Sequence, residues 1–334
     1  MPAPTTSRSS TAGWSTRAAI AVTGLRKSYG KQVVLDSIDL RVAEGTVFAL
    51  LGPNGAGKTT MVHILSTLIS ADDGQARIGG HDLAREPEAI RGLIGLTGQF
   101  SAVDNLLTGA ENLKLMADLH HLGGAEGKAR VAVLLDKFDL VDAAAKPVTV
   151  YSGGMKRRLD LAMTLVGSPR IIFLDEPTTG LDPRSRRTMW DIIRGLVADG
   201  VTIFLTTQYL DEADQLADRV GVLDHGRLIA EGTPDELKRR VPGGHIRLQF
   251  ADPQGLDSAA RLLDGSTRDD EGLTLQVPSD AGVRSLRALL DRLDSAAVDV
   301  DTLSIHLPDL DDVFLALTGS EPASNQDLER ESVR

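Results

Sequence analysis

The sequence contains no cysteine, so it can form no disulfide and offers no thiolate nucleophile or cysteine-ligated metal site. Such a composition fits the reducing cytosol. Aromatic residues make up only 4% of the 334 residues, but 42% are hydrophobic, which is enough for a substantial core. At roughly 150 residues per domain, the length predicts two domains, or one large domain with an appendage.

Long apolar runs and an excess of basic charge are also missing. No stretch approaches the roughly 18 to 20 apolar residues that span a bilayer, and the N-terminus has no apolar core of a secretory signal. We therefore expect the chain neither to span a membrane nor to enter the secretory pathway. The formal net charge is −11. Because a nucleic-acid binder normally carries a basic patch, no nucleic-acid partner is expected.

The acidic charge is concentrated near the C-terminus. Residues 1–242 carry 28 basic and 29 acidic side chains, a net of −1, whereas residues 243–334 carry 8 and 18, a net of −10. A Pro-Gly-Gly turn signal lies at this change of composition and predicts a domain boundary. The predicted segments are a disordered arm (1–17), a large domain (18–242), a small α+β domain (243–319) and a disordered tail (320–334).

The large domain alternates short apolar runs with helical patterns. Runs that are apolar on both faces suit central strands of a sheet that helices cover on both sides. Three such runs occur, at 47–51, 171–174 and 201–205. Helices are expected near 60–68, 110–122, 128–138, 155–166 and 184–198. The alternation is typical of an α/β layered domain.

The small domain also mixes strands and helices. Strands are expected at 246–250, 273–277 and 300–307, and a helix at 281–293. Asp309 can cap a final helix, on which Leu310, Val313, Phe314 and Leu317 share one face and after which Gly319 is the stop. The carboxylates of this helix start, Asp309 and Asp312, are better explained as N-terminal charge than as catalytic groups. We expect an accessory or regulatory module.

The sharpest motif is the G-x-x-x-x-G-K-[ST] sequence after the first apolar run. Glycines let the backbone curl so that its N–H groups converge on phosphate oxygens at the start of the next helix. Lys58 would reach the β- and γ-phosphates, and Thr59 would ligate Mg²⁺. A structural loop is the alternative, and the strand before and helix after favour nucleotide binding. The predicted nucleotide-binding residues here are Gly52, Pro53, Asn54, Gly55, Ala56, Gly57, Lys58, Thr59 and Thr60.

Two carboxylates, Asp175 and Glu176, follow the apolar run at 171–174. In doubly wound sheets, ligands gather at the carboxyl ends of the strands. Asp175 can hold Mg²⁺, and Glu176 can accept a proton from an attacking water. On its own, such a pair of carboxylates more often lies in a solvated turn. The phosphate loop earlier in the chain makes a role in Mg²⁺ binding and catalysis the preferred interpretation.

A third motif, residues 151–159, opens a helix about twenty residues before Asp175. A serine and two glycines at a helix start form another anion-binding concavity. The segment resembles the signature motif of ATP-binding cassette (ABC) ATPases. The resemblance implies that this motif caps the γ-phosphate held by the partner subunit of a head-to-tail dimer. The residues given this role are Tyr151, Ser152, Gly153, Gly154 and Met155.

Further matches to the ABC pattern follow in the family's order and cover about residues 18–240. Tyr29 resembles the aromatic that stacks on adenine; without this context, a surface tyrosine would be the preferred interpretation. Gln99 resembles the Q-loop glutamine that touches Mg²⁺, and Asp182 lies in a D-loop-like segment that would cross between subunits. Gln208 stands where the family usually has the H-loop histidine. It can donate to the γ-phosphate or orient water, but it cannot titrate near neutral pH.

The chain is thus identified as a member of the ABC ATPases, whose fold is a RecA-like core with a helical subdomain. The signature, Gln208 and residues 310–319 together resemble the daunorubicin-resistance type of exporter ATPase. This resemblance implies a homodimer that hydrolyses Mg²⁺-bound ATP at Glu176 and Gln208. It also implies a separate multi-span permease, a peripheral location on the cytoplasmic face of the membrane, and efflux of a hydrophobic small molecule.

Two other functions and several simpler interpretations remain open at this point. A non-transport ABC ATPase on ribosomes or DNA would usually have two cassettes or a long coiled-coil insertion, and neither is present. An importer ATPase is the second alternative, although the C-terminal resemblance favours export. The basic runs 156–158 and 184–187 are expected to be solvated helix faces. His120 and His121 have no second ligand cluster nearby, so a metal site there is not expected.

Overall fold

The computed structural model describes residues 18–99, 102–240, 244–279, 283–306 and 308–318. The predicted arm and tail lie outside these residues. The chain divides into two compact units, residues 1–229 and 230–334. The division falls before the boundary predicted at residue 242, because helix α8 (Pro234–Lys238) contacts helix α11 (Leu310–Thr318) of the second unit. No described helix is long and apolar enough to cross a membrane.

The first unit begins with an antiparallel sheet that the sequence patterns did not predict. Its strands are β1 (Ala18–Tyr29), β2 (Gln32–Ala43), β4 (Asp73–Ile78) and β5 (His81–Asp82), in the order β2-β1-β4-β5. In β2, the buried residues Ile38, Leu40 and Val42 alternate with more exposed ones. A half-buried antiparallel strand shows this alternation instead of an apolar run, so runs that are apolar on both faces do not indicate this sheet.

The second sheet of this unit carries the predicted apolar runs. Its order is β10-β9-β3-β8-β7-β6, and the pairs from β9 to β6 are parallel. The strands are β3 (Val47–Leu51), β6 (Ile94–Thr97), β7 (Ile171–Asp175), β8 (Thr202–Thr207), β9 (Arg219–Asp224) and β10 (Arg227–Gly232). Every residue of β3, β7 and β8 is buried, which confirms the prediction of central strands. Parallel pairing brings the carboxyl ends of these three strands to one edge.

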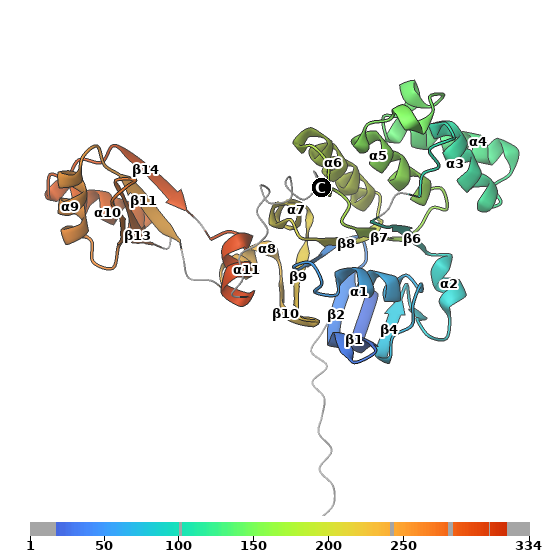
Figure 1. Cartoon of the computed structure of the whole chain (residues 1–334), viewed down its shortest axis with the longest axis horizontal. Helices are drawn as coiled ribbons and strands as arrows, with labels where there is room; N and C mark the ends of the chain where they lie inside the picture. Colours follow the sequence, from blue (N-terminus) through green and yellow to red (C-terminus); the bar gives the residue numbers. More distant parts are fainter. Residues whose placement is uncertain (1–17, 100–101, 241–243, 280–282, 307, 319–334) are drawn as a thin grey trace, which may run out of the picture. The chain divides into compact units, whose positions relative to one another are not determined.

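Helices surround this sheet (Figure 1). They include α1 (Lys58–Leu65), α5 (Gly153–Thr164), α6 (Pro183–Ala198) and α7 (Leu210–Leu216). A short α2 (Pro87–Arg91) precedes β6, and α3 (Gly109–Leu119) and α4 (Gly124–Lys137) form a helical region that contacts α5. Thr108 and Glu111 cap α3 reciprocally, which fixes its start. The unit therefore has an α/β core with a helical subdomain.

The second unit contains a small α+β module. Its elements are β11 (His245–Gln249), α9 (Pro253–Leu262), β12 (Thr267–Asp269), β13 (Thr274–Pro278), α10 (Val283–Ser295) and β14 (Thr302–His306). The sheet order is β12-β13-β11-β14 and all pairs are antiparallel. This is the split β-α-β arrangement of ferredoxin-like modules. Ile246, Leu248 and Leu275 are buried in its core.

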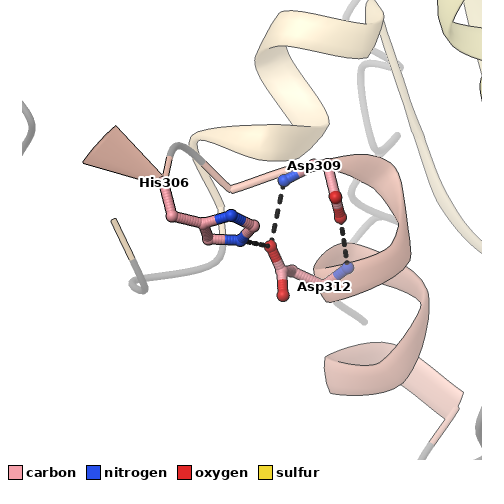
Figure 2. Close-up of side chains that lie close together, drawn as sticks. All are labelled: His306, Asp309 and Asp312. Carbon is pink, nitrogen blue, oxygen red and sulfur yellow. Dashed lines mark hydrogen bonds and ion pairs between the residues drawn. The ribbon is translucent and has the colours of Figure 1, made fainter. Parts of the chain in front are cut away.

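Helix α11 follows β14 and has a reciprocal cap (Figure 2). The Asp312 backbone N–H donates to Asp309 Oδ1 at 3.0 Å, and the Asp309 N–H donates to Asp312 Oδ2 at 3.0 Å. His306 Nε2 lies 3.3 Å from the same Asp312 oxygen. The two carboxylates therefore serve the helix start, as predicted. Leu310, Val313 and Phe314 are buried, but Leu317 is 40% exposed, so the buried stripe is shorter than predicted.

Candidate functional site

The loop between β3 and α1 depends on its glycines. Gly55 and Gly57 have φ angles of 81° and 109°, in the left-handed region that favours glycine. A Cβ at Gly57 would also lie 2.8 Å from the Val34 carbonyl oxygen, and one at Gly52 would lie 2.3 Å from the Leu223 carbonyl oxygen. The loop can therefore be formed only by a sequence with glycine at these positions, and it leads directly into α1.

Lys58 opens α1 and is buried beneath the loop. Its side chain is 5% exposed, and Nζ donates to the carbonyl oxygens of Gly52 at 2.8 Å and Pro53 at 3.1 Å. Glu176 Oε1 lies 3.6 Å from Nζ. Burial lowers the pKa of Lys58, while the neighbouring carboxylates of Glu176 and Asp175 raise it. The ammonium is thus placed at the sheet edge, where it can bind an anion.

Asp175 ends β7 and lies beside the threonine that follows Lys58. Its Oδ1 accepts hydrogen bonds from Thr206 Oγ1 at 2.5 Å and from Thr59 Oγ1 at 3.3 Å. A carboxylate and a hydroxyl that meet in this way form the hard-oxygen donor set that suits Mg²⁺. The structure therefore brings together Thr59 and Asp175, the two predicted Mg²⁺ ligands that are farthest apart in the sequence. Strand β8 contributes Thr206, which the sequence patterns did not indicate.

Glu176 adopts an unusual backbone conformation at the same edge. Its φ is 49°, a left-handed conformation that is costly for a non-glycine residue. The strand neighbour Thr206 holds it there by accepting the Glu176 N–H at 3.1 Å. The side chain is 11% exposed, and its Oε2 accepts a hydrogen bond from Thr179 Oγ1 at 3.3 Å. Glu176 is therefore a held carboxylate rather than a solvated turn residue.

The signature segment forms the start of α5. Ser152 caps the helix, since its Oγ accepts the Met155 N–H at 3.2 Å. Ser152 and Gly153 are exposed, and a Cβ at Gly153 would meet no atom within 4 Å. Gly154 instead packs against α6, where a Cβ would lie 2.5 Å from Ser185 Oγ. Tyr151 is buried and donates its hydroxyl to the Ala143 carbonyl at 2.7 Å, so its side chain anchors the segment rather than lying on the exposed surface.

Asp182 caps α6. It accepts hydrogen bonds from the backbone N–H groups of Arg184 and Ser185 and from Ser185 Oγ at 2.6 Å. These bonds, led by that of the Ser185 hydroxyl, lower the pKa of Asp182. Because Ser185 also lies against Gly154, the cap connects the D-loop-like segment with the signature segment.

The remaining predicted residues are distributed around the same unit. Gln99 is exposed just after β6, and Gln208 is half-buried just after β8. Both strands belong to the parallel sheet. Tyr29 ends β1 in the antiparallel sheet, with 53% of its surface exposed and Lys27 Nζ 5.6 Å from its ring centre.

Two basic runs that were expected to be solvated are partly buried. Arg157 and Arg158 are 12% and 17% exposed, and both donate to backbone carbonyl groups. In the second run, Arg186 is 14% exposed, pairs with Asp211 at 3.4 Å and lies over the ring of Tyr209. The prediction of solvated faces was therefore wrong for these three arginines. Arg157 and Asp160 are three residues apart on one helix, and this spacing was the sequence signal that could have indicated their ion pair.

Sequence reasoning also missed Glu212 of α7, which is completely buried. Its Oε1 accepts hydrogen bonds from Thr178 Oγ1 at 2.9 Å and Trp190 Nε1 at 3.2 Å, and its Oε2 has no partner among the described residues. Burial raises the pKa of Glu212, and the hydrogen bonds it accepts only partly oppose the shift. Glu212 therefore joins the loop after Glu176 to helices α6 and α7.

This buried carboxyl predicts a pH dependence of stability. Because the pKa of Glu212 is raised in the folded state, its contribution to stability is fully present below the unfolded-state pKa of about 4.3 and is lost as the pH rises through the folded pKa. Glu212→Gln should remove this loss, so the free energy of unfolding of the wild type should fall relative to the variant as pH rises. Urea unfolding at several pH values measures the difference.

The matched control for that series is Glu111→Gln. Hydrogen bonds from Thr108 lower the pKa of Glu111, so the wild type should gain stability over this variant as the pH rises through the unfolded-state value, the opposite sign. Parallel pH profiles for Glu212→Gln and the wild type would remove Glu212 as the source of the dependence.

Comparison with known proteins gives the same assignment as the geometry. Residues 35–179 match the family model described as ABC transporter. The daunorubicin resistance ATP-binding protein DrrA3 of Streptomyces coeruleorubidus is 50% identical over 91% of this chain and 96% of its own length. The daunorubicin/doxorubicin resistance ATP-binding protein DrrA of Streptomyces peucetius is 47% identical over 93% and 95%. The Nod factor export ATP-binding protein I of Paraburkholderia xenovorans is 39% identical over 91% and 98%.

Solved structures of ATP-binding cassettes also match this chain. An ATP-binding subunit of an ABC transporter is 31% identical, has a TM-score of 0.60 and is matched over 66% of this chain and 92% of its own. A dimeric ATP-binding cassette bound to ADP and Pi is 27% identical, with a TM-score of 0.59, over 64% and 98%. With the phosphate loop and the carboxylates at one sheet edge, these matches show that the chain belongs to the ABC transporter family, as an ATP-hydrolysing, ATP-binding protein related to the daunorubicin-resistance type.

Proposed function

We propose that this chain powers the export of a hydrophobic small molecule through a separate multi-span membrane subunit. Relatives named for daunorubicin resistance and for Nod factor export support this class of cargo. The observation that carries the proposal is the convergence of Lys58, Thr59, Asp175 and Glu176 at the carboxyl edge of the parallel sheet. Neither the importer nor the non-transport alternative is favoured by these relatives.

The catalytic roles follow from the charges at that edge. Residues 52–60 would cradle the phosphates of ATP, with Lys58 on the β- and γ-phosphates. Thr59 and Asp175, with Gln99, would hold Mg²⁺, which neutralises charge on the phosphates when bound. Glu176, held by Thr179, would accept the proton of the attacking water.

Two copies of the chain would complete each site in a head-to-tail dimer. The exposed start of α5 supports this, because Ser152 and Gly153 form an open helix N-terminus that can bind the γ-phosphate of the partner's nucleotide. Asp182 would hold the D-loop at the same interface. Gln208 would contact the γ-phosphate, and exposed Tyr29 would stack on adenine.

The chain would be peripheral on the cytoplasmic face of the membrane, bound to the permease. The small second unit would serve dimer contact or coupling, since no phosphate loop occurs after residue 243. Closure on ATP and release after hydrolysis would alternate the two states of the permease.

Affinity purification from native membranes in mild detergent tests this function. We expect a multi-span protein to co-purify and the reconstituted complex to move daunorubicin, followed by its fluorescence, only with ATP. The Lys58→Ala complex is the control, because it should assemble but not transport. Recovery of the chain with ribosomes or DNA and without a membrane protein would favour the non-transport class instead.

A further inference from the structure

Arg157 connects α5 to three segments of the nucleotide site, although it is not among the signature residues that were predicted to face the nucleotide. It lies five residues beyond Ser152 and is 12% exposed. Its guanidinium group donates to four backbone carbonyl oxygens: Gly98 at 2.8 Å, Pro177 at 2.9 Å, Asp175 at 3.0 Å and Glu176 at 3.2 Å. One side chain therefore holds the backbone beside Gln99, the end of β7 and the first turn of the loop that follows.

Two more side chains on the same face of α5 contact the backbone and side chains around Gln99. Asp160, at i+3, lies 3.5 Å from the Arg157 guanidinium and accepts the Ala102 N–H at 3.2 Å. Thr164, at i+7, has its hydroxyl 3.0 Å from that of Thr97. Residues three, four and seven apart share one face of a helix. This face thus contacts the chain on both sides of Gln99.

Only arginine can make this set of contacts. Its planar guanidinium group carries five N–H donors in a fixed fork, whereas lysine offers three donors on a single nitrogen. Burial of the charge lowers the pKa of Arg157, and the carboxylates of Asp160 and Asp175 oppose that shift. A buried charge of this kind is tolerated when it is paired and hydrogen-bonded.

We propose that Arg157 is a positioning residue that couples the two ATP sites of the dimer. The inference rests on the head-to-tail dimer of the proposed function. In that dimer, the start of α5 faces the partner's nucleotide, whereas the backbone held by Arg157 carries Gln99 and Glu176, which face the chain's own nucleotide. A rigid link between the two means that closure of α5 on one nucleotide places the catalytic groups of the other.

The first test is Arg157→Lys, which keeps the charge but loses the fork. Equilibrium affinity for ATP should stay within about threefold of wild type, because Lys58 and its loop are untouched, while kcat should fall about 10- to 100-fold from misplacement of the catalytic groups. The control is Arg130→Lys, since Arg130 binds the Leu165 carbonyl at the other end of α5 at 2.7 Å. It should lower stability similarly and leave kcat near wild type. Equal kcat losses in the two variants would overturn the inference.

A second test uses dimer formation instead of turnover. Glu176→Gln should accumulate an ATP-bound dimer, detected by sedimentation, and adding Arg157→Lys should reduce the dimer fraction at saturating ATP without a change in monomer affinity. A double variant that dimerises as well as Glu176→Gln would overturn the coupling role alone. If Glu176→Gln by itself stays monomeric with ATP while binding it, the proposed head-to-tail dimer fails, and the inference fails with it.

Discussion

Glu176→Gln should retain ATP binding and lose turnover by about 10² to 10⁴, the typical effect of removing a general base. Glutamine has the same shape and can still accept the hydrogen bond from Thr179, but it cannot take a proton from water. The 3.6 Å ion pair with Lys58 is also lost. Nucleotide stays bound, so the dimer should persist.

Single-turnover hydrolysis of ATP measures this effect directly, because it separates chemistry from product release. Glu88→Gln is a suitable control, since Glu88 lies in α2, is 85% exposed and pairs only with Arg91 in the ion pairs described. The control should hydrolyse ATP at the wild-type rate. A Glu176→Gln rate within about threefold of wild type would remove Glu176 from the base role.

Lys58→Ala should weaken ATP affinity and stop hydrolysis. The ammonium is the cation at the phosphate end of the loop, and a charge-assisted hydrogen bond of this kind contributes about 1.5 to 3 kcal/mol, or roughly 10- to 150-fold in affinity. Its removal also leaves the carboxylates of Asp175 and Glu176 without a neutralising charge near the phosphates. The lost hydrogen bond and the unneutralised carboxylates should both weaken ATP binding.

Titration with a fluorescent ATP analogue and steady-state hydrolysis together test this substitution. Lys137→Ala is the matched control, because Lys137 ends α4 and pairs with the exposed Asp199 at 2.5 Å. Unchanged affinity and turnover in Lys58→Ala would show that residues 52–59 are not the working site.

The sequence alone specified the nucleotide loop and the central strands. The loop is local: its glycines have positive φ angles that other residues adopt at a cost, and Lys58 follows them directly. The strands β3, β7 and β8 are apolar on both faces because helices cover both sides of their sheet. The loop conformation and the burial of the strands can therefore be predicted from a short motif or a run of five residues, because neither depends on knowing which distant residues are in contact. The resemblance carried by the ordered motifs then identified the family.

Tertiary structure decided the features that depend on partners far along the chain. Whether an arginine is solvated depends on which carbonyl groups it meets, and Arg157 meets Gly98 and Glu176, which lie 59 and 19 residues away. Glu212 is buried because Thr178 and Trp190 supply its donors. The sequence does not distinguish a solvated charged side chain from a buried one, because the cost of burying the charge is offset only by hydrogen bonds that the folded backbone brings together. The sequence therefore predicted candidate site residues, and only the fold showed which hydrogen bonds and ion pairs hold their side chains in place.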